Sequence, residues 1–219
     1  LSVSWDLGDK IRNGYGRIYN NNCGKISFGD YRSIKTSDVA LKVKDCYIKN
    51  DSNTTTHTTR VLDAVVYENC TFPYFSGDNA TLVNCTVQPA EQIRFNLHFY
   101  DCTFKVLDGV SSEVFFNFSN IDNVDRVFDN CTFEGKTRFS VFLRSAEFKD
   151  CTFDDLELYV GTGNENERLT FENCTIKSTS NNFLQTGPYY YSRGYLNVTF
   201  KDCNITHTGT NLIYLFGNS

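Results

Sequence analysis

Hydrophobic and polar residues alternate with a period of two in short stretches that recur along the whole chain. The clearest stretch is 169–176, Leu-Thr-Phe-Glu-Asn-Cys-Thr-Ile, where apolar, aromatic and cysteine residues stand two or three positions apart. Alternation over a few residues is typical of a β-strand with one buried face. We therefore predict a chain built mainly from short strands.

Cysteines mark how often this unit recurs. From Cys46 onward, an apolar or aromatic residue stands three positions before each cysteine, and Phe, Ile or Val stands two positions after it. Each cysteine is directly preceded by Asn or Asp, and only the Cys23 copy departs from the two apolar positions. Successive cysteines are 15 to 29 residues apart, and a unit that recurs at about this spacing is the signature of a repeat architecture. The nine cysteines stand at 23, 46, 70, 85, 102, 131, 151, 174 and 203.

The alternation changes phase at the Asn or Asp of each unit. An aromatic residue three positions before a cysteine cannot face inward together with that cysteine on one straight strand. A bend at the intervening Asn or Asp, in the left-handed backbone conformation that these residues tolerate, lets both face inward. We predict such a bend in every repeat.

A strand, an Asn or Asp bend and a second strand, repeated on average every 22.5 residues, closely resembles the right-handed parallel β-helix. The resemblance covers residues 18–216 and implies an all-β solenoid of about nine rungs, stacked about 4.8 Å apart. It makes 1–219 a single domain, with 1–17 as a leading rung or cap. The spacing around Ala80–Val87 is short, so this segment is either an insertion or a pinched rung. The implied Asn/Asp and Cys ladders contain Asn69, Asp101, Asn130, Asp150, Asn173 and Asp202, and Cys70, Cys102, Cys131, Cys151, Cys174 and Cys203.

The leucine-rich repeat is the alternative fold, because its core motif also matches residues 169–176. The repeat length varies too much for that fold, the helical half of each repeat is missing, and Leu is not dominant. We therefore favour the β-helix.

We predict that the cysteines are free and buried. Stacked parallel side chains hold their Cβ atoms about 4.8 Å apart, which is beyond the usual disulfide range. No zinc-binding spacing occurs, and we expect neither a metal nor another cofactor. A ladder of free thiols favours folding in a reducing compartment. Four of the nine Asn-x-Ser/Thr sequons fall on predicted bends, which we expect to be buried and unable to carry glycans.

Composition and charge limit the classes of partner that we expect the chain to bind. The chain has 26 acidic and 21 basic residues, a formal net charge of -5 and no basic run, so we expect no nucleic-acid partner. Its apolar runs are too short for a membrane span, so we expect no insertion into a membrane. The absence of Met and the apolar strand at 212–216 indicate a fragment of a longer protein.

Two groups of residues are candidate sites. Glu134 and Asp154 are expected to be stacked neighbours on the outer surface, where two carboxylates are a weak candidate for glycoside hydrolysis. The loop with Tyr189, Tyr190, Tyr191 and Arg193 is a candidate for stacking on sugar rings and holding polar groups.

The chain resembles the β-helical domains of bacteriophage tailspikes, tail fibres and appendages. That resemblance implies a virion protein that binds a cell-surface glycan or receptor, as a homo-oligomer that is trimeric by analogy. One alternative is a β-helical enzyme, a lyase or glycoside hydrolase that degrades polysaccharide. Another is a bacterial or archaeal adhesin, which would be secreted or at the cell surface. The sequence leaves enzymatic activity open.

Overall fold

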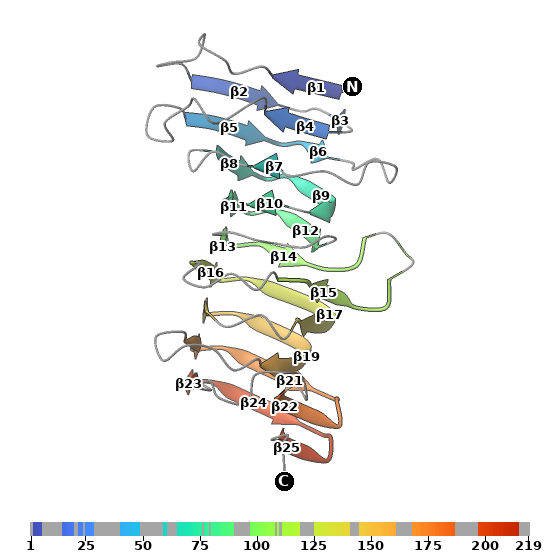
Figure 1. Cartoon of the computed structure of the whole chain (residues 1–219), viewed down its shortest axis with the longest axis vertical. Helices are drawn as coiled ribbons and strands as arrows, with labels where there is room; N and C mark the ends of the chain where they lie inside the picture. Colours follow the sequence, from blue (N-terminus) through green and yellow to red (C-terminus); the bar gives the residue numbers. More distant parts are fainter. Residues whose placement is uncertain are drawn as a thin grey trace.

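The computed structural model forms an elongated stack with the two termini at opposite ends (Figure 1). It describes residues 2–5, 15–19, 22–23, 25–28, 40–48, 59–60, 65–75, 77–78, 80–89, 97–107, 109, 111–118, 125–140, 145–160, 168–186 and 197–214. Within these ranges the regular secondary structure consists of strands, and no helix is present. The all-β prediction is therefore confirmed.

Two long parallel sheets run the length of the stack. Successive strands of the chain mostly enter the two sheets in turn, and each pairs in parallel with a strand from an adjacent repeat. This topology is consistent with a parallel β-helix. In spatial order, the first sheet contains β2 (Tyr15–Tyr19), β5 (Ala40–Lys44), β8 (Val65–Glu68), β11 (Ala80–Val83), β13 (Leu97–Tyr100), β16 (Arg126–Asp129), β18 (Ala146–Lys149), β20 (Leu169–Glu172) and β23 (Val198–Lys201).

The second sheet has twelve strands, because three mid-repeat strands join it. Its main path, from the N-terminal end, is β3 (Asn22–Cys23), β6 (Tyr47–Ile48), β9 (Thr71–Phe75), β12 (Thr86–Pro89), β14 (Thr103–Phe104), β17 (Thr132–Phe139), β19 (Thr152–Val160), β21 (Thr175–Ser178) and β24 (Asn204–His207). The mid-repeat strands are β15 (Val114–Phe116), β22 (Asn182–Thr186) and β25 (Asn211–Tyr214). Two smaller parallel pairs join β1 (Ser2–Trp5) to β4 (Lys25–Phe28) and β7 (Thr59–Arg60) to β10 (Gly77–Asp78).

The short repeat around Ala80–Val87 is a regular part of the stack. Strand β11 pairs with β8 and β13, and β12 pairs with β9 and β14. The segment is therefore not an insertion.

From Asp45 onward, every turn from the first sheet into the second is made by an Asn or Asp with left-handed backbone. The φ angles of these residues lie between 51° and 56°, which confirms the predicted bend. The short polar side chain of Asn or Asp makes this conformation accessible at low steric cost. The Asx column, as we call this set, consists of Asp45, Asn69, Asn84, Asp101, Asn130, Asp150, Asn173 and Asp202.

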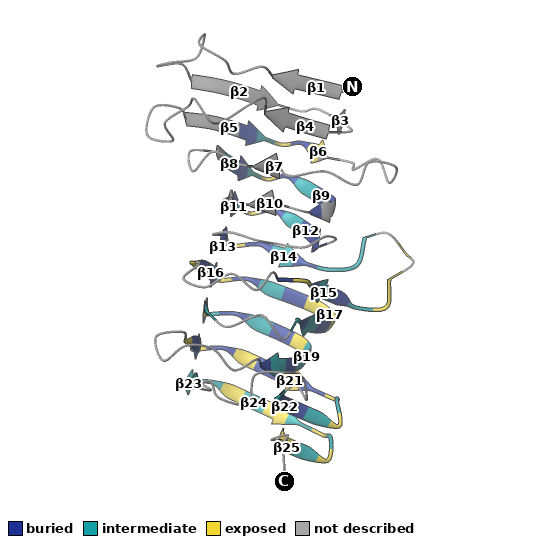
Figure 2. Ribbon diagram, viewed as in Figure 1, coloured by how far each residue is buried: buried dark blue, intermediate teal, exposed yellow. Residues whose placement is uncertain are grey.

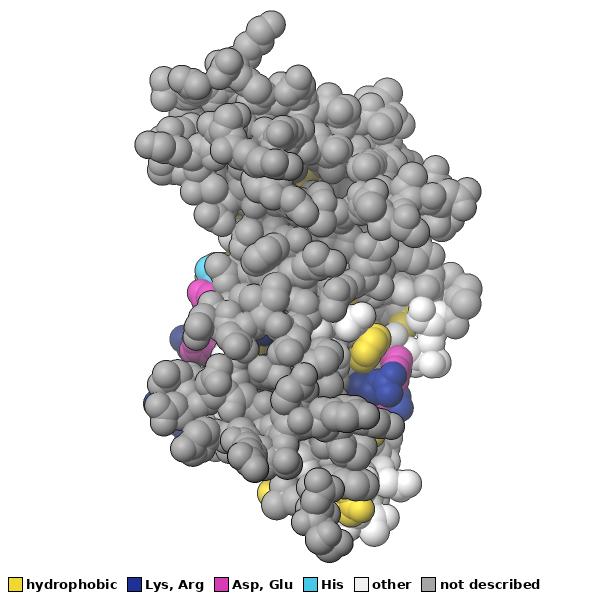
Figure 3. Space-filling view, in the orientation of Figure 1, with side chains coloured by type: hydrophobic (Ala, Val, Ile, Leu, Met, Phe, Trp, Pro, Cys, Tyr) yellow, Lys and Arg dark blue, Asp and Glu magenta, His cyan; other side chains and the backbone are white. Residues whose placement is uncertain are grey.

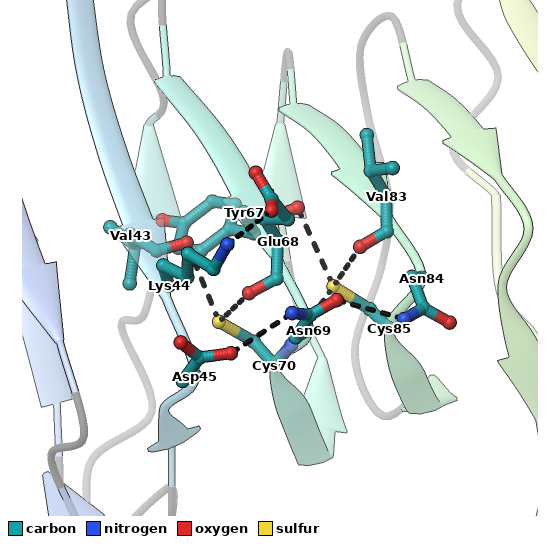
Figure 4. Close-up of polar contacts among 10 residues, drawn as sticks. All are labelled: Val43, Lys44, Asp45, Tyr67, Glu68, Asn69, Cys70, Val83, Asn84 and Cys85. Carbon is teal, nitrogen blue, oxygen red and sulfur yellow. Dashed lines mark hydrogen bonds and ion pairs between the residues drawn. The ribbon is translucent and has the colours of Figure 1, made fainter.

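Hydrogen bonds link members of the Asx column between repeats. The Nδ2 of Asn69 donates to Oδ1 of Asp45 at 2.9 Å, and the Nδ2 of Asn84 donates to Oδ1 of Asn69 at 2.8 Å (Figure 4). Asn130 donates in the same way to Asp101, and Asn173 to Asp150. The series is interrupted wherever Asp follows Asn, because an ionised carboxylate has no hydrogen to donate.

The bends lie at the surface, contrary to the sequence-based expectation that they are buried. Asn69, Asn84, Asn130 and Asn173, the four bend residues in Asn-Cys-Thr sequons, are all exposed. Burial therefore does not exclude glycans from these positions, although each Nδ2 already donates a hydrogen bond along the column.

The cysteine after each bend points inward. Eight described cysteines are free; seven are buried, and Cys203 is half-buried. Their thiols bond to backbone carbonyls: the Sγ of Cys85 donates to the carbonyl of Val83 at 3.3 Å and to that of Tyr67, one repeat earlier, at 3.5 Å (Figure 4). In such three-centre bonds one thiol hydrogen is shared between two backbone carbonyl oxygens, so a small, largely apolar side chain supplies a hydrogen bond to the backbone at the turn. The Cys column is Cys46, Cys70, Cys85, Cys102, Cys131, Cys151, Cys174 and Cys203.

Stacked phenylalanines fill the interior beside the cysteines, and the buried positions recur along the strands of the stack (Figure 2). Phe148 packs face to face between Phe128 and Phe171, with ring centroids 4.6 and 4.7 Å apart and interplanar angles of 12° and 6°. In a parallel column on the second sheet, Phe133 stacks on Phe153 at 4.3 Å. Equivalent positions in successive repeats therefore form continuous aromatic columns, each pair adding about 0.5–1.5 kcal/mol beyond its buried area.

Two positions depart from the repeat. Cys23 pairs in register with Ile48 rather than with Cys46, so it lies outside the Cys column although an Asn precedes it. Arg126 takes an inward position that is apolar in neighbouring repeats, and it is 1% exposed. Its guanidinium lies 4.5 Å from the ring centroid of Phe118 and donates to the carbonyl of Ser145 at 3.4 Å.

Candidate functional site

The described surface carries a cluster of charged, amide and aromatic side chains on one side of the stack. It lies on the mid-repeat strands β15, β22 and β25 and the second halves of β17 and β19, which pair side by side. Figure 3 shows basic and acidic side chains gathered beside hydrophobic ones at the right of the view. We call this surface the polar face; it consists of Glu113, Phe115, Lys136, Arg138, Glu157, Tyr159, Asn182, Gln185, Asn211 and Tyr214.

Two glutamates and two basic residues form its centre. The Nη2 of Arg138 lies 2.7 Å from Oε1 of Glu113. The Nζ of Lys136 bridges the two acids, 3.5 Å from Oε2 of Glu113 and 3.3 Å from Oε2 of Glu157. The glutamate side chains are only 18% and 16% exposed. Because each acid has a cation beside it, the formal charge of these four residues is balanced.

A run of amides extends the cluster toward the C-terminal end of the stack. Gln185 donates its Nε2 hydrogen to Oε1 of Glu157 at 3.1 Å, and its own Oε1 accepts from Nδ2 of Asn182 at 3.2 Å. The Oδ1 of Asn182 in turn accepts from Nδ2 of Asn211 at 2.8 Å. One unbroken chain of polar contacts therefore runs from Arg138 to Asn211 and fixes the orientation of every planar side chain in it.

The environment of Lys136 keeps this side chain charged. Partial burial alone would lower the pKa of Lys136, but hydrogen bonding and charge interactions with Glu157 and Glu113 outweigh it and raise the pKa above its ordinary value of 10.5. A lysine with a raised pKa is a poor proton acceptor near neutral pH. Lys136 is therefore suited to holding a ligand oxygen rather than to general base catalysis.

Aromatic rings flank the polar chain. Arg138 lies over the ring of Phe115, 4.9 Å from its centroid. Along the outward column of β19, β22 and β25, the register aligns Tyr159, Gln185 and Tyr214. Phe115 and Tyr159 are half-buried, Tyr214 is 41% exposed and Gln185 between the two tyrosines is buried, so ring surface is available on either side of a fixed amide.

Glu134 and Asp154, the predicted carboxylate pair, lie on neighbouring strands beside a β-bulge. The pairing of β17 with β19 shifts between Phe133 and Lys136, and Gly135 within the bulge has a φ of 75°. The Oδ2 of Asp154 accepts from the backbone N–H of Gly135 at 3.3 Å, and Glu134 lies 3.7 Å from Nζ of Lys105. Each carboxylate thus has its own partner, and the two candidate residues lie on neighbouring strands, as predicted.

The outward column of the first sheet is a row of opposite charges. Asp129, Lys149, Glu172 and Lys201 follow one another in register, and Lys201 forms an ion pair with Glu172. Near this column the Nε2 of His98 lies 2.9 Å from Oδ2 of Asp125. Such exposed pairs contribute little to stability.

The tyrosine loop, with Tyr189, Tyr190, Tyr191 and Arg193, lies outside the described residues. The polar face, in contrast, was not predicted from the sequence. Part of its signal was present in the second halves of β17 and β19, where Lys136 and Arg138 stand two positions apart and Glu157 alternates with apolar residues in 156–160. Aligning those strands with one another would have placed Arg138 beside Glu157, which is their register in the sheet.

Within the described ranges, no group of three or more His, Cys, Asp or Glu side chains is arranged to hold a metal ion. A search of the same ranges for a helix of the length and hydropathy that a membrane span requires found none.

Comparison of the chain with protein-family models, with curated proteins and with solved structures found no match.

Proposed function

We propose that this chain is a recognition module of parallel β-helix type that binds a cell-surface glycan through the polar face. The observation that carries the proposal is the continuous chain of oriented polar side chains from Arg138 to Asn211, flanked by aromatic rings. Sugars present hydroxyl groups around an apolar ring face. Fixed planar donors and acceptors beside aromatic surface match that chemistry.

The same contacts favour binding over catalysis. Lys136 is held as a cation by Glu157 and Glu113, and both glutamates are engaged with basic partners. An arrangement in which every charge is already paired holds a ligand by directed hydrogen bonds.

Further features of the proposal come from the sequence resemblance. We infer a right-handed coil, because parallel strands are joined by right-handed crossovers in nearly all proteins, with about nine rungs joined by Asn/Asp and Cys ladders. The setting we propose is a bacteriophage tailspike, fibre or appendage, with the chain acting as a homo-oligomer, trimeric by analogy, on the virion.

A glycan array probed with the purified chain, followed by mass spectrometry of each bound glycan before and after incubation, tests the function. We expect binding without a change in glycan mass. Lys136→Ala and Arg138→Ala should weaken binding, whereas Lys149→Ala, an exposed lysine on the first sheet, should not. Release of shortened glycans would contradict the binding role, and Glu134→Ala and Asp154→Ala would then be the first variants to test for lost cleavage.

The oligomer and virion parts have separate tests. Sedimentation equilibrium should give three times the monomer mass of 25.0 kDa, and a monomer would overturn the trimer. Antibodies raised against the chain should label tails or appendages of purified virions if the virion assignment is correct.

A further inference from the structure

We infer that the glycan is an uncharged, extended, β-linked chain lying parallel to the stack axis, with one sugar per rung across the polar face. The inference rests on the proposed glycan-binding function and specifies its ligand. It follows from three properties of the face: its repeat distance, the placement of its tyrosines and its charge.

The repeat distance comes from the pairing of strands. Strands β15, β17, β19, β22 and β25 are consecutive neighbours in one parallel sheet, and neighbouring strands lie about 4.8 Å apart. This spacing is close to the length that one pyranose ring occupies in an extended β-1,4-linked chain. A glycan lying along the axis therefore meets an equivalent strand at each sugar, whereas a glycan lying across the axis meets no repeated feature.

The tyrosines fit every second sugar. Tyr159 and Tyr214 occupy the same outward column with Gln185 between them, so the two rings are separated by two strand spacings, about 10 Å. In an extended β-1,4-linked chain, alternate sugars are turned over and the repeating unit is a disaccharide of about that length. The intervening Gln185 is only 8% exposed and is bonded to Glu157 and Asn182, so its planar amide is fixed beneath the position where the middle sugar would pass.

The charge of the face favours an uncharged ligand. Glu113 and Glu157 are matched by Lys136 and Arg138, and the rest of the polar chain consists of neutral amides. An acidic polysaccharide would have to compete with the glutamates for the two cations. A neutral glycan instead accepts and donates hydrogen bonds without breaking any of these three ion pairs.

Titration calorimetry of the complete 219-residue chain tests the inference. The probes are cello-, chito- and manno-oligosaccharides of two to six sugars, with oligogalacturonates as acidic comparators. We expect affinity for at least one neutral series to rise with length and to level off at about five sugars, because five strands form the face. Binding should change little with added salt, since no net charge is neutralised.

Two tyrosine variants locate the chain on the face. Tyr159→Ala and Tyr214→Ala should each lower affinity for the hexasaccharide about tenfold, an amount equal to about 1.4 kcal/mol. Tyr159→Phe keeps the ring and should retain most of the affinity. Tyr100→Ala, a half-buried tyrosine on the first sheet, should leave binding unchanged. Thermal unfolding of each variant separates lost binding from lost folding.

The outcomes distinguish this inference from the proposed function. Preference for the oligogalacturonates, affinity independent of chain length, or full affinity in both Tyr→Ala variants would overturn the inference while leaving a glycan-binding module in place. Failure of all four probe series would also overturn the inference, and any glycan then bound on the array would show that the module recognises another class. Failure of the array as well would overturn the proposed function itself.

Discussion

Gln185 donates its side-chain amide to Glu157 at 3.1 Å, although 28 residues separate the two along the chain. The contact joins a charged cluster on one side to a run of amides on the other. Because Glu157 also holds Lys136 at 3.3 Å, it is the junction at which ionic and neutral hydrogen bonding meet. A substitution at Glu157 therefore affects both the ion pair with Lys136 and the hydrogen bond with Gln185.

Glu157→Gln should lower the free energy of unfolding by about 0.5–1 kcal/mol. The variant keeps an acceptor for Gln185 and removes only the charge opposite Lys136, which is 43% exposed. Urea unfolding followed by circular dichroism measures the change. Glu134→Gln is the matched control, because Glu134 is 48% exposed and lies 3.7 Å from Lys105. An equal loss of unfolding free energy in both variants would show that Glu157 contributes no more stability than an ordinary exposed ion pair.

The stabilisation that Lys136 provides should disappear only at alkaline pH. Its pKa in the folded protein is raised above the ordinary value of 10.5, through Glu157 and Glu113 against the opposing effect of burial. A group with a raised folded-state pKa stabilises fully below its unfolded pKa and loses that effect as pH rises through the folded value. The difference in melting temperature between the protein and Lys136→Met should be constant from pH 7 to about 10 and should shrink above that. A difference that shrinks between pH 7 and 9 would contradict the assignment.

Local chemistry made most of the fold predictable. The left-handed bends, the inward cysteines and the aromatic positions follow from a phase change within eight residues, as in 169–176, and no long-range information is needed to see it. The structure has positive φ at all eight bends from Asp45 to Asp202. Cys23 shows the limit of this method, because its preceding Asn imitates the motif while the register pairs Cys23 with Ile48.

The polar face depended on a strand pairing that the repeat around the cysteines does not specify. Lys136 reaches Glu157 only because a bulge at Gly135 shifts the pairing of β17 with β19. Which mid-repeat residues become neighbours is set by turn lengths that differ from repeat to repeat. The buried Arg126 was missed for a related reason, since its ring partner Phe118 and its acceptor Ser145 come from other segments.

Asp101→Asn should stabilise the protein by about 1 kcal/mol. Asp101 accepts from Asn130 at 2.7 Å, but its carboxylate has no hydrogen to offer Asn84 in the preceding repeat. An amide at this position keeps the first bond and adds a second, which makes the Asx column continuous across the three repeats. Denaturant unfolding gives the change in stability.

The opposite change, from Asn to Asp at the neighbouring position 130, is the control for the Asx column. Asn130→Asp removes the donor to Asp101 and places carboxylates in three successive repeats, because Asp150 follows. It should destabilise the protein, and more so at low salt, where repulsion between exposed charges is least screened. A destabilising Asp101→Asn would refute the view that the Asp residues interrupt the column.

Thiol labelling should separate Cys203 from the rest of the Cys column. Cys203 is half-buried near the C-terminal end of the stack, whereas the seven others described are buried. Hydrogen bonding to the thiols of Cys102 and Cys151, together with burial, raises the pKa of the Cys131 thiol, so it stays protonated and unreactive. In a Cys23→Ser background, Ellman's reagent should modify one thiol rapidly and the other seven only on unfolding. Rapid modification of several thiols in the folded protein would contradict the inward placement of the Cys column.

Phe148→Ala should cost about 3–5 kcal/mol, the usual range for removing a fully buried phenylalanine. Phe148 is completely buried, stacked between Phe128 and Phe171. Phe200 occupies the same column one repeat beyond Phe171, stacked at 5.0 Å, but it is only half-buried. Phe200→Ala should therefore cost less than half as much, because one face of its ring has no stacked neighbour among the described residues. Urea unfolding of the two variants measures the difference in stability. Equal losses of unfolding free energy would mean that stacking between repeats contributes less than the burial of each ring within its own repeat.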